Sequence, residues 1–313
     1  LKERAHWIVQ PCQHCGLSEL FDAPSDLVRV AFPDIPQGSV PEMFTTFCGA
    51  CGGMQAVEFN EAGSIGENSN EPIEKPETDD ISSFHQNFYM TQDIDNVAYA
   101  MYALDNSDIS LNSLLGPMTG LYAEVFRANP ERLSGWVSEI ETLSDRGQHL
   151  FTSALWQSGT PEAEEYLEKR MNTATGEDKA MLQAYLDHTP ADMRTMVPTD
   201  GVEADMLWGA FFATGDPVFV RNLIAAAAQY GNRDSCEIFA AAAVTKWSLV
   251  SNAQQHELVF QILQSELSNH DGEARAVIQD MIDKSKLPSG AAMIAEESEQ
   301  IFDEKERSGE WRE

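Results

Sequence analysis

Two similar cysteine pairs near the start of the chain constrain its fold more than any other feature. The first pair is Cys12 and Cys15, the second is Cys48 and Cys51, and a glycine follows each pair directly. Zinc in structural sites takes four ligands in a tetrahedron, and two intervening residues let one tight turn present both thiolates to the same ion. A glycine suits such a turn because it has no Cβ to hinder a positive φ. We therefore predict that these four cysteines bind one structural zinc ion.

The paired motifs resemble those of zinc-ribbon and rubredoxin-like proteins over about residues 5–60. Those families carry the cysteine pairs on neighbouring hairpin turns, so the resemblance implies a small antiparallel sheet. The 32 residues between the two pairs exceed what a minimal ribbon needs and include four prolines, which indicates a loop insertion. Segments rich in β-branched and aromatic residues are the predicted strands: 6–9, 27–32, 44–47 and 54–59.

Other states of the same cysteines are compatible with their spacing. Iron in the same cage of four thiolates would give an electron-transfer site, and it is the alternative cofactor to zinc. Two disulfides would require an oxidising compartment. A redox-active pair of the thioredoxin type would require a motif that opens a helix, whereas the glycines favour turns. His6 and His14 lie close by, but four cysteines already complete the coordination, so neither is expected to be a ligand.

Composition divides the rest of the chain. Segment 61–83 has few apolar residues, seven acidic residues and one lysine, so burial cannot offset the entropy lost on ordering, and we predict a flexible acidic linker. It separates a metal-binding module, residues 1–60, from an all-helical domain, residues 84–288. The charged tail, residues 289–313, is predicted to be an exposed helix followed by disorder. The chain is therefore expected to be mainly α-helical with one small β module.

Four pairs of a capping residue and a proline mark predicted helix starts. Proline suits the first helical position, and a preceding side-chain oxygen can cap free backbone amides. Spacings of 31, 29 and 27 residues approximate one helical hairpin, so we predict antiparallel hairpins that stack as in an α-solenoid. The resemblance to tetratricopeptide or HEAT-type solenoids is loose, and an irregular bundle is the other arrangement compatible with these helices. The four pairs are Asn129-Pro130, Thr160-Pro161, Thr189-Pro190 and Asp216-Pro217.

The charge of the chain restricts its binding partners. Fifty-one acidic and twenty basic residues give a net charge of −31, which opposes close approach to phosphate backbones and anionic lipids. We therefore expect a protein partner, basic in charge, and no direct contact with nucleic acid. No apolar run reaches the ~20 residues of a transmembrane helix, and the first residues lack a signal-peptide pattern. Because thiolate ligands need reducing conditions, we expect the cytoplasm or another reducing compartment.

Catalytic motifs are lacking from the sequence. It contains no phosphate-binding or dinucleotide-binding glycine loop, no HExxH and no GxSxG. Four histidines, His149, His188, His256 and His270, are predicted near helix ends, where structural roles are expected. Cys236 is expected to be a small buried apolar group. We predict a non-catalytic interaction or scaffold protein with acidic docking helices. The alternative is a redox or electron-transfer protein that uses iron or reactive thiols at the four paired cysteines.

Overall fold

The computed structural model describes residues 7–9, 43–47, 54–59 and 78–308. It divides into two compact units, Leu1–Lys75 and Pro76–Glu313, and the boundary falls inside the predicted linker. The linker prediction extends too far, because helix α2 begins at Thr78. The physical reason is that the Ile81 side chain is buried in a hydrophobic core. This burial stabilises the first turns of α2, which include two of the acidic residues assigned to the linker.

The first unit contains a three-stranded antiparallel sheet. Its strands are β1 (Trp7–Val9), β2 (Met43–Phe47) and β3 (Met54–Phe59), in the order β1-β3-β2. Val9 lies opposite Val57, and Phe47 lies opposite Met54. The predicted strands 6–9, 44–47 and 54–59 therefore match strands in the structure within a residue at each end. The predicted strand 27–32 and the four paired cysteines lie outside the described residues.

The second unit consists of helices and the loops between them over residues 78–308, with no strand in that range, which confirms the mainly α-helical prediction. None of its helices combines the length and apolarity needed to cross a membrane. Its elements are α2 (Thr78–Thr91), η1 (Ile94–Asn96), α3 (Val97–Asp105), α4 (Leu111–Ala128), α5 (Pro130–Ile140), α6 (Asp145–Ser158), α7 (Pro161–Met171), α8 (Gly176–Asp187), α9 (Gly201–Thr214), α10 (Pro217–Ala227), η2 (Ala228–Gly231), α11 (Cys236–Gln255), α12 (Glu257–Glu266), η3 (Leu267–Asn269), α13 (Gly272–Ser285) and α14 (Gly290–Ser308).

Buried side chains of the helical unit form two hydrophobic cores. One core lies mainly among α2 to α8 and includes Tyr122 and Phe151. The other lies mainly among α9 to α14 and includes Phe211 and Phe239. Phe212 of α9 packs against both cores. Helix α9 therefore joins the two halves of the unit, because its side chains contribute to both cores.

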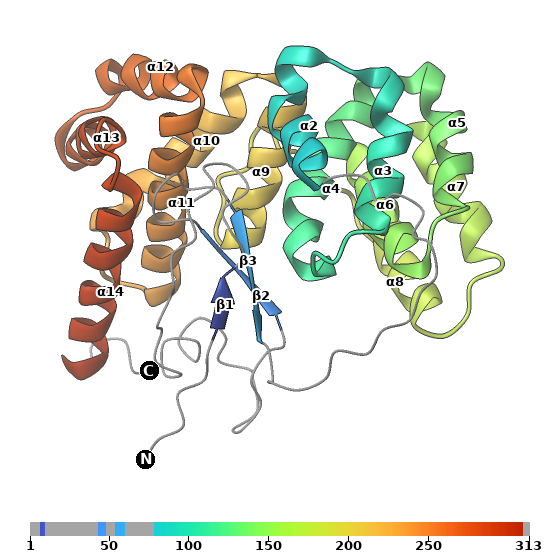
Figure 1. Cartoon of the computed structure of the whole chain (residues 1–313), viewed down its shortest axis with the longest axis horizontal. Helices are drawn as coiled ribbons and strands as arrows, with labels where there is room; N and C mark the ends of the chain where they lie inside the picture. Colours follow the sequence, from blue (N-terminus) through green and yellow to red (C-terminus); the bar gives the residue numbers. More distant parts are fainter. Residues whose placement is uncertain (1–6, 10–42, 48–53, 60–77, 309–313) are drawn as a thin grey trace. The chain divides into compact units, whose positions relative to one another are not determined.

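Helices α4 and α9 make the most extensive contact in the unit, although four helices separate them in sequence. Figure 1 shows them side by side near the middle of the helical unit. A methyl group added to Gly209 would overlap the Pro117 carbonyl oxygen, and one added to Gly120 would overlap that of Met206. The two backbones therefore touch. Stacking of sequence neighbours, as a solenoid requires, does not describe this part of the unit.

The predicted helix start at Pro217 is confirmed. Gly215 ends α9 with a φ of 68°, a left-handed conformation that glycine adopts without a Cβ penalty. The Asp216 side chain then accepts a hydrogen bond from the Val218 amide at 3.0 Å and caps α10. The predicted start at Pro161 is also confirmed, because the Thr160 side chain accepts from the Ala163 amide at 3.3 Å.

The predicted helix start at Pro190 is wrong. Residues 188–200 between α8 and α9 form no helix. Side chains of neighbouring helices hold this segment by its carbonyl groups: Gln157 donates to Ala191 at 2.7 Å, and Asn222 donates to Met193 at 3.2 Å. The Met193 side chain is also buried. These tertiary contacts outweigh the local preference for a helix.

Helix α14 confirms the helix predicted in the C-terminal segment, but it is not simply exposed. Ile294 of α14 is fully buried, and Ile301 and Phe302 pack against the second core. Lys284 of α13 also donates to the Glu297 carboxylate of α14 at 2.7 Å. The apolar positions in this charged sequence are few, but their helical spacing places them together on the face that meets the core.

Candidate functional site

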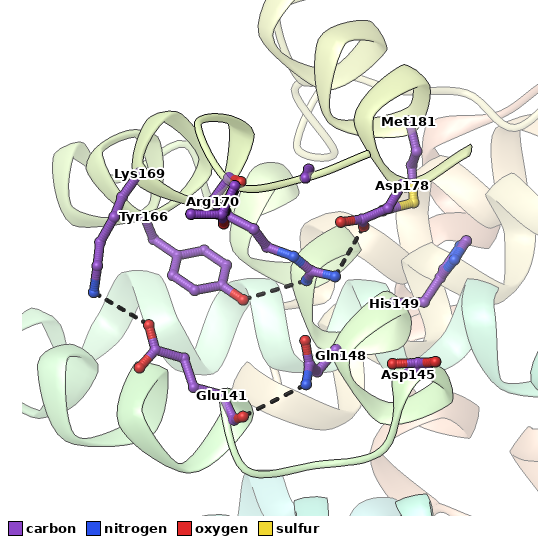
Figure 2. Close-up of a pocket in the computed structure, with 11 residues that line it drawn as sticks. Glu141, Asp145, Gln148, His149, Tyr166, Lys169, Arg170, Asp178 and Met181 are labelled. Carbon is purple, nitrogen blue, oxygen red and sulfur yellow. Dashed lines mark hydrogen bonds and ion pairs between the residues drawn. The ribbon is translucent and has the colours of Figure 1, made fainter. Parts of the chain in front are cut away.

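A pocket of about 730 Å³ lies among helices α5 to α8 (Figure 2). Its volume falls within the range of roughly 300–1,000 Å³ that is typical of ligand sites. It opens where the turn between α5 and α6 approaches the turn between α7 and α8. The residues that line it are Glu141, Asp145, Gln148, His149, Tyr166, Lys169, Arg170, Thr173, Ala174, Asp178 and Met181.

Local sequence fixes the helix ends that carry these residues. The Ser144 hydroxyl accepts from the Gly147 amide and starts α6 directly after the short turn that follows α5. Asp145 is therefore the first residue of α6, while Gln148 and His149 lie one turn further on. Tyr166 and Arg170 are four residues apart in α7, a spacing that places both on one face of a helix.

Arg170 holds three of the four helices together. Its guanidinium donates to the Thr152 hydroxyl of α6 at 2.7 Å and to the Tyr166 hydroxyl at 3.3 Å. It also donates to the Asp178 carboxylate of α8 at 2.9 Å, while its side chain is 17% exposed. The charge of Arg170 is therefore already matched within the protein, and its main role is to hold the base of the pocket.

The mouth of the pocket contains a weaker ion pair. The Lys169 ammonium lies 3.3 Å from the Glu141 carboxylate, and these side chains are 74% and 46% exposed. Exposed pairs of this kind contribute only about 0–1 kcal/mol to stability. Gln148 donates its side-chain amide to the Leu143 carbonyl at 2.9 Å and so holds the turn between α5 and α6.

Asp145 and His149 differ from the other charged or titratable residues of the pocket. Among the residues that the structure describes, neither side chain forms a hydrogen bond or an ion pair. His149 is half-buried and lies in the second turn of α6, so its predicted position near a helix end is wrong.

A second group of interest is the buried pair His85 and Tyr122. The His85 Nε2 atom lies 2.9 Å from the Tyr122 hydroxyl, and both residues are buried. Burial lowers the pKa of His85 from 6.5 to about 4 and raises that of Tyr122. The histidine is therefore neutral near pH 7. This pair lies between helices rather than at the pocket and is a satisfied core contact.

His85 was not among the residues predicted from the sequence to have a special role. Its position on the apolar face of α2, between Ile81 and Phe88 at helical spacing, was the available signal. The linker prediction hid that signal, because it assigned the first turns of α2 to a flexible segment.

Lys246 is the most deeply buried cation that the structure describes, with a side chain 3% exposed. Its ammonium lies 2.7 Å from the Asp280 carboxylate and 3.9 Å from the centre of the Tyr230 ring. Burial lowers the pKa of Lys246, and Asp280 opposes that shift. Since Lys284 also contacts Asp280, at 3.0 Å, the cluster ties α11 to α13. The Lys246 ammonium is buried in it, whereas the Asp280 carboxylate is partly exposed.

The remaining predicted residues have varied outcomes. Cys236 is exposed at the start of α11, so the prediction of a buried thiol is wrong. Ser235 caps that helix, so Cys236 is its first residue, and its side chain is exposed to solvent. His188 and His256 directly follow α8 and α11, as predicted. His256 is buried, and its Nδ1 atom lies 3.4 Å from the Tyr89 hydroxyl.

A metal site within the described residues would need several ligating side chains close together. Over those residues, no three His, Cys, Asp or Glu side chains come together in a way that could hold a metal ion. The predicted ligands Cys12, Cys15, Cys48 and Cys51 lie outside the described residues, so they stay predictions.

Comparisons with known proteins identify no relative. No protein-family model, no curated protein and no solved structure matches this chain.

Proposed function

We propose that this chain is a non-catalytic interaction or scaffold protein with two working parts. The first is a module at residues 1–60 held by one zinc ion on Cys12, Cys15, Cys48 and Cys51. The second is an acidic helical unit that docks a basic protein partner. Thiolate ligands require reducing conditions, so the proposal includes a reducing compartment.

The observation that supports the zinc module is the direction of the strands. Strands β1 and β2 both run antiparallel to β3 and therefore point the same way. Cys12 follows β1 by three positions, and Cys48 directly follows β2. Each cysteine pair thus begins just after a strand that leaves the same end of the sheet. Such an arrangement suits four thiolates that share one ion.

The zinc would supply folding energy to this small module rather than chemistry. A short sheet of this size buries little apolar surface, and metal binding is commonly coupled to the folding of such modules. The alternative metal, iron, would occupy the same four thiolates and give an electron-transfer protein. Metal identity therefore separates the two functions.

The docking part of the proposal is supported by charge. From residue 84 onward the chain carries 37 acidic and 16 basic residues. Few of the acidic side chains are buried, and Glu124 and Glu266 are the buried exceptions in the described range. Most of the negative charge therefore faces solvent, where it raises the encounter rate with a positively charged partner.

The test is the metal content of the whole protein purified without added metal, with a visible spectrum and a free-thiol count. We expect one zinc per chain and a colourless solution. The substitution Cys48→Ser should abolish zinc binding and make the N-terminal unit sensitive to protease while the helical content is retained. Cys236→Ser is the matched control and should keep the zinc, because this thiol lies exposed on α11. Iron with visible colour would replace this proposal with electron transfer, and disulfides without metal would exclude both.

A further inference from the structure

The sequence contains two aspartyl-glycine bonds and no asparaginyl-glycine bond. They are Asp200-Gly201 and Asp271-Gly272, and they stand at the starts of α9 and α13. An aspartyl side chain can react with the backbone nitrogen of the residue that follows it, because the two groups close a five-membered ring. Glycine favours this reaction, since it has no Cβ to hinder the approach. The chain therefore has two positions at which the same chemistry can occur.

The backbone does not distinguish the two bonds. Asp200 has a ψ of −179° and Asp271 a ψ of 170°, so both residues are extended. Both aspartates are also exposed. A Cβ added to Gly201 or to Gly272 would meet nothing within 4 Å. Space for the ring is therefore available at both positions.

The two carboxyl groups differ in their contacts. The Asp200 carboxylate accepts a hydrogen bond from the Glu203 amide at 2.9 Å and caps α9. The Glu203 carboxylate in turn accepts from the Thr199 amide at 2.7 Å, so this turn is held from both sides. The Asp271 side chain makes no cap hydrogen bond to α13. No such bond therefore restrains it from rotating toward the Gly272 nitrogen.

We propose that Asp271 is a site of spontaneous conversion to isoaspartate in the folded protein. The Gly272 nitrogen attacks the side-chain carboxyl carbon of Asp271 in its acid form, the nitrogen loses its proton, and one water molecule leaves. The product is a cyclic imide. One water molecule then opens the ring: attack at the original main-chain carbonyl gives isoaspartate, and attack at the other carbonyl restores aspartate. The water consumed equals the water released, and no oxidant or cofactor takes part.

The conversion alters the start of α13. The main chain gains one methylene group at residue 271, and the former main-chain carbonyl becomes a free carboxylate. In the unmodified chain that carbonyl accepts from the Arg275 amide at 3.4 Å. The buried residues by which α13 packs, among them Val277, Ile278 and Met281, lie beyond this turn. We therefore expect a loosened first turn rather than loss of the helix.

The test uses the full chain, held for several weeks in mildly acidic buffer at a temperature well below its melting transition. Isoaspartate and aspartate have the same mass, so the peptides that contain residues 200 and 271 are examined by electron-transfer fragmentation, which distinguishes the isomers. Conversion should be roughly fivefold faster at Asp271 than at Asp200, the factor that corresponds to one cap hydrogen bond. In urea, where neither helix is formed, the two rates should be nearly equal.

Asp271→Glu is the variant that locates the reaction. It preserves the charge but would have to close a six-membered ring, so conversion at residue 271 should stop while conversion at Asp200 is unchanged. An isomer signal that persists in this variant would place the reaction at another residue. Equal rates at Asp200 and Asp271 in the folded chain would overturn the assignment. So would conversion of Asp271 in urea alone, because the fold would then protect the bond.

Discussion

His85 illustrates at the scale of one residue how a titratable group can be part of a hydrophobic core. Its ring contacts the Tyr122 ring edge to face and the Phe84 ring in a similar way. The hydrogen bond to the Tyr122 hydroxyl satisfies one of its nitrogens. The charged form has no carboxylate to stabilise it there, so burial favours the neutral ring.

We expect the stability of the helical unit to fall between about pH 6.5 and pH 4 because of His85. The unfolded chain binds a proton near the usual pKa of 6.5, whereas the folded chain binds it only near 4. As the pH falls through this window the unfolded state gains protons, and the free energy of unfolding decreases by roughly 3 kcal/mol in total. Below the lower pKa the effect is complete, and above the higher one it is absent.

The comparison is between the unmodified chain and His85→Gln, which does not titrate. Urea unfolding gives the free energy of unfolding of each chain at pH 7 and at pH 5. Between these two values the unmodified chain should lose about 2 kcal/mol more than the variant. Because both chains carry the same carboxylates, other titrations cancel. An unchanged difference would mean that His85 is not held neutral by burial.

The crossing of α4 and α9 dominates at the scale of secondary-structure elements. Pro117 lies inside α4 and cannot donate the usual helical hydrogen bond. Its own carbonyl oxygen faces the site where Gly209 has no side chain. The two helices can approach closely only because glycines occupy this contact. The two cores of the unit meet where these helices cross.

We therefore expect Gly209→Ala to destabilise the helical unit by about 2 kcal/mol or more, since the added methyl group forces the helices apart. Thermal or urea unfolding would measure the loss. The change runs against helix propensity, by which alanine is favoured over glycine by roughly 1 kcal/mol in a helix interior.

Gly135→Ala is the matched control. Gly135 lies within α5, and a methyl group added there would meet nothing within 4 Å. This substitution should stabilise by about 0.5–1 kcal/mol through propensity alone. A Gly209 variant as stable as the Gly135 variant would show that α4 and α9 are not in backbone contact.

Charge is the dominant property at the scale of the whole molecule. The net charge of −31 arises because 51 acidic residues outnumber 20 basic residues, so ion pairs can compensate only part of the negative charge. The same repulsion that keeps acidic chains apart acts within the folded chain and opposes compactness. The charge suits a docking function and reduces stability at low salt.

Salt should therefore stabilise this protein. The screening length falls from about 10 Å at 0.1 M to about 3 Å at 1 M, so repulsion among exposed carboxylates weakens. Calorimetry in sodium chloride and in potassium chloride should show the melting temperature rising by several degrees in both salts alike. A falling melting temperature would instead mean that attractive ion pairs dominate the surface.

Much of the local structure was predictable because its causes are local. The caps at Thr160 and Asp216 and the left-handed Gly215 are determined within a few neighbouring residues. Such caps contribute roughly 1 kcal/mol each, enough to set a boundary when nothing opposes them. The strands 44–47 and 54–59 follow from local composition in the same way.

The start of α2, the loop at Pro190 and the covered face of α14 depended on distant partners. The structure of each is determined by packing against residues that lie elsewhere in the sequence. The same holds for the pocket, whose residues come from three helices and the turns beside them, and for His149, which was expected at a helix end. Arg170 shows the reason, because its three contacts lie on α6, α7 and α8.

The sequence by itself determined the helical class from residue 84 onward, several helix boundaries, the acidic surface and a cysteine pattern that predicts one metal ion. Tertiary structure alone decided which helices touch, where two cores form and where a pocket opens. The division follows from distance along the chain. Capping and propensity act over a few residues, whereas the meeting of Gly209 with Pro117 depends on packing between helices far apart in sequence.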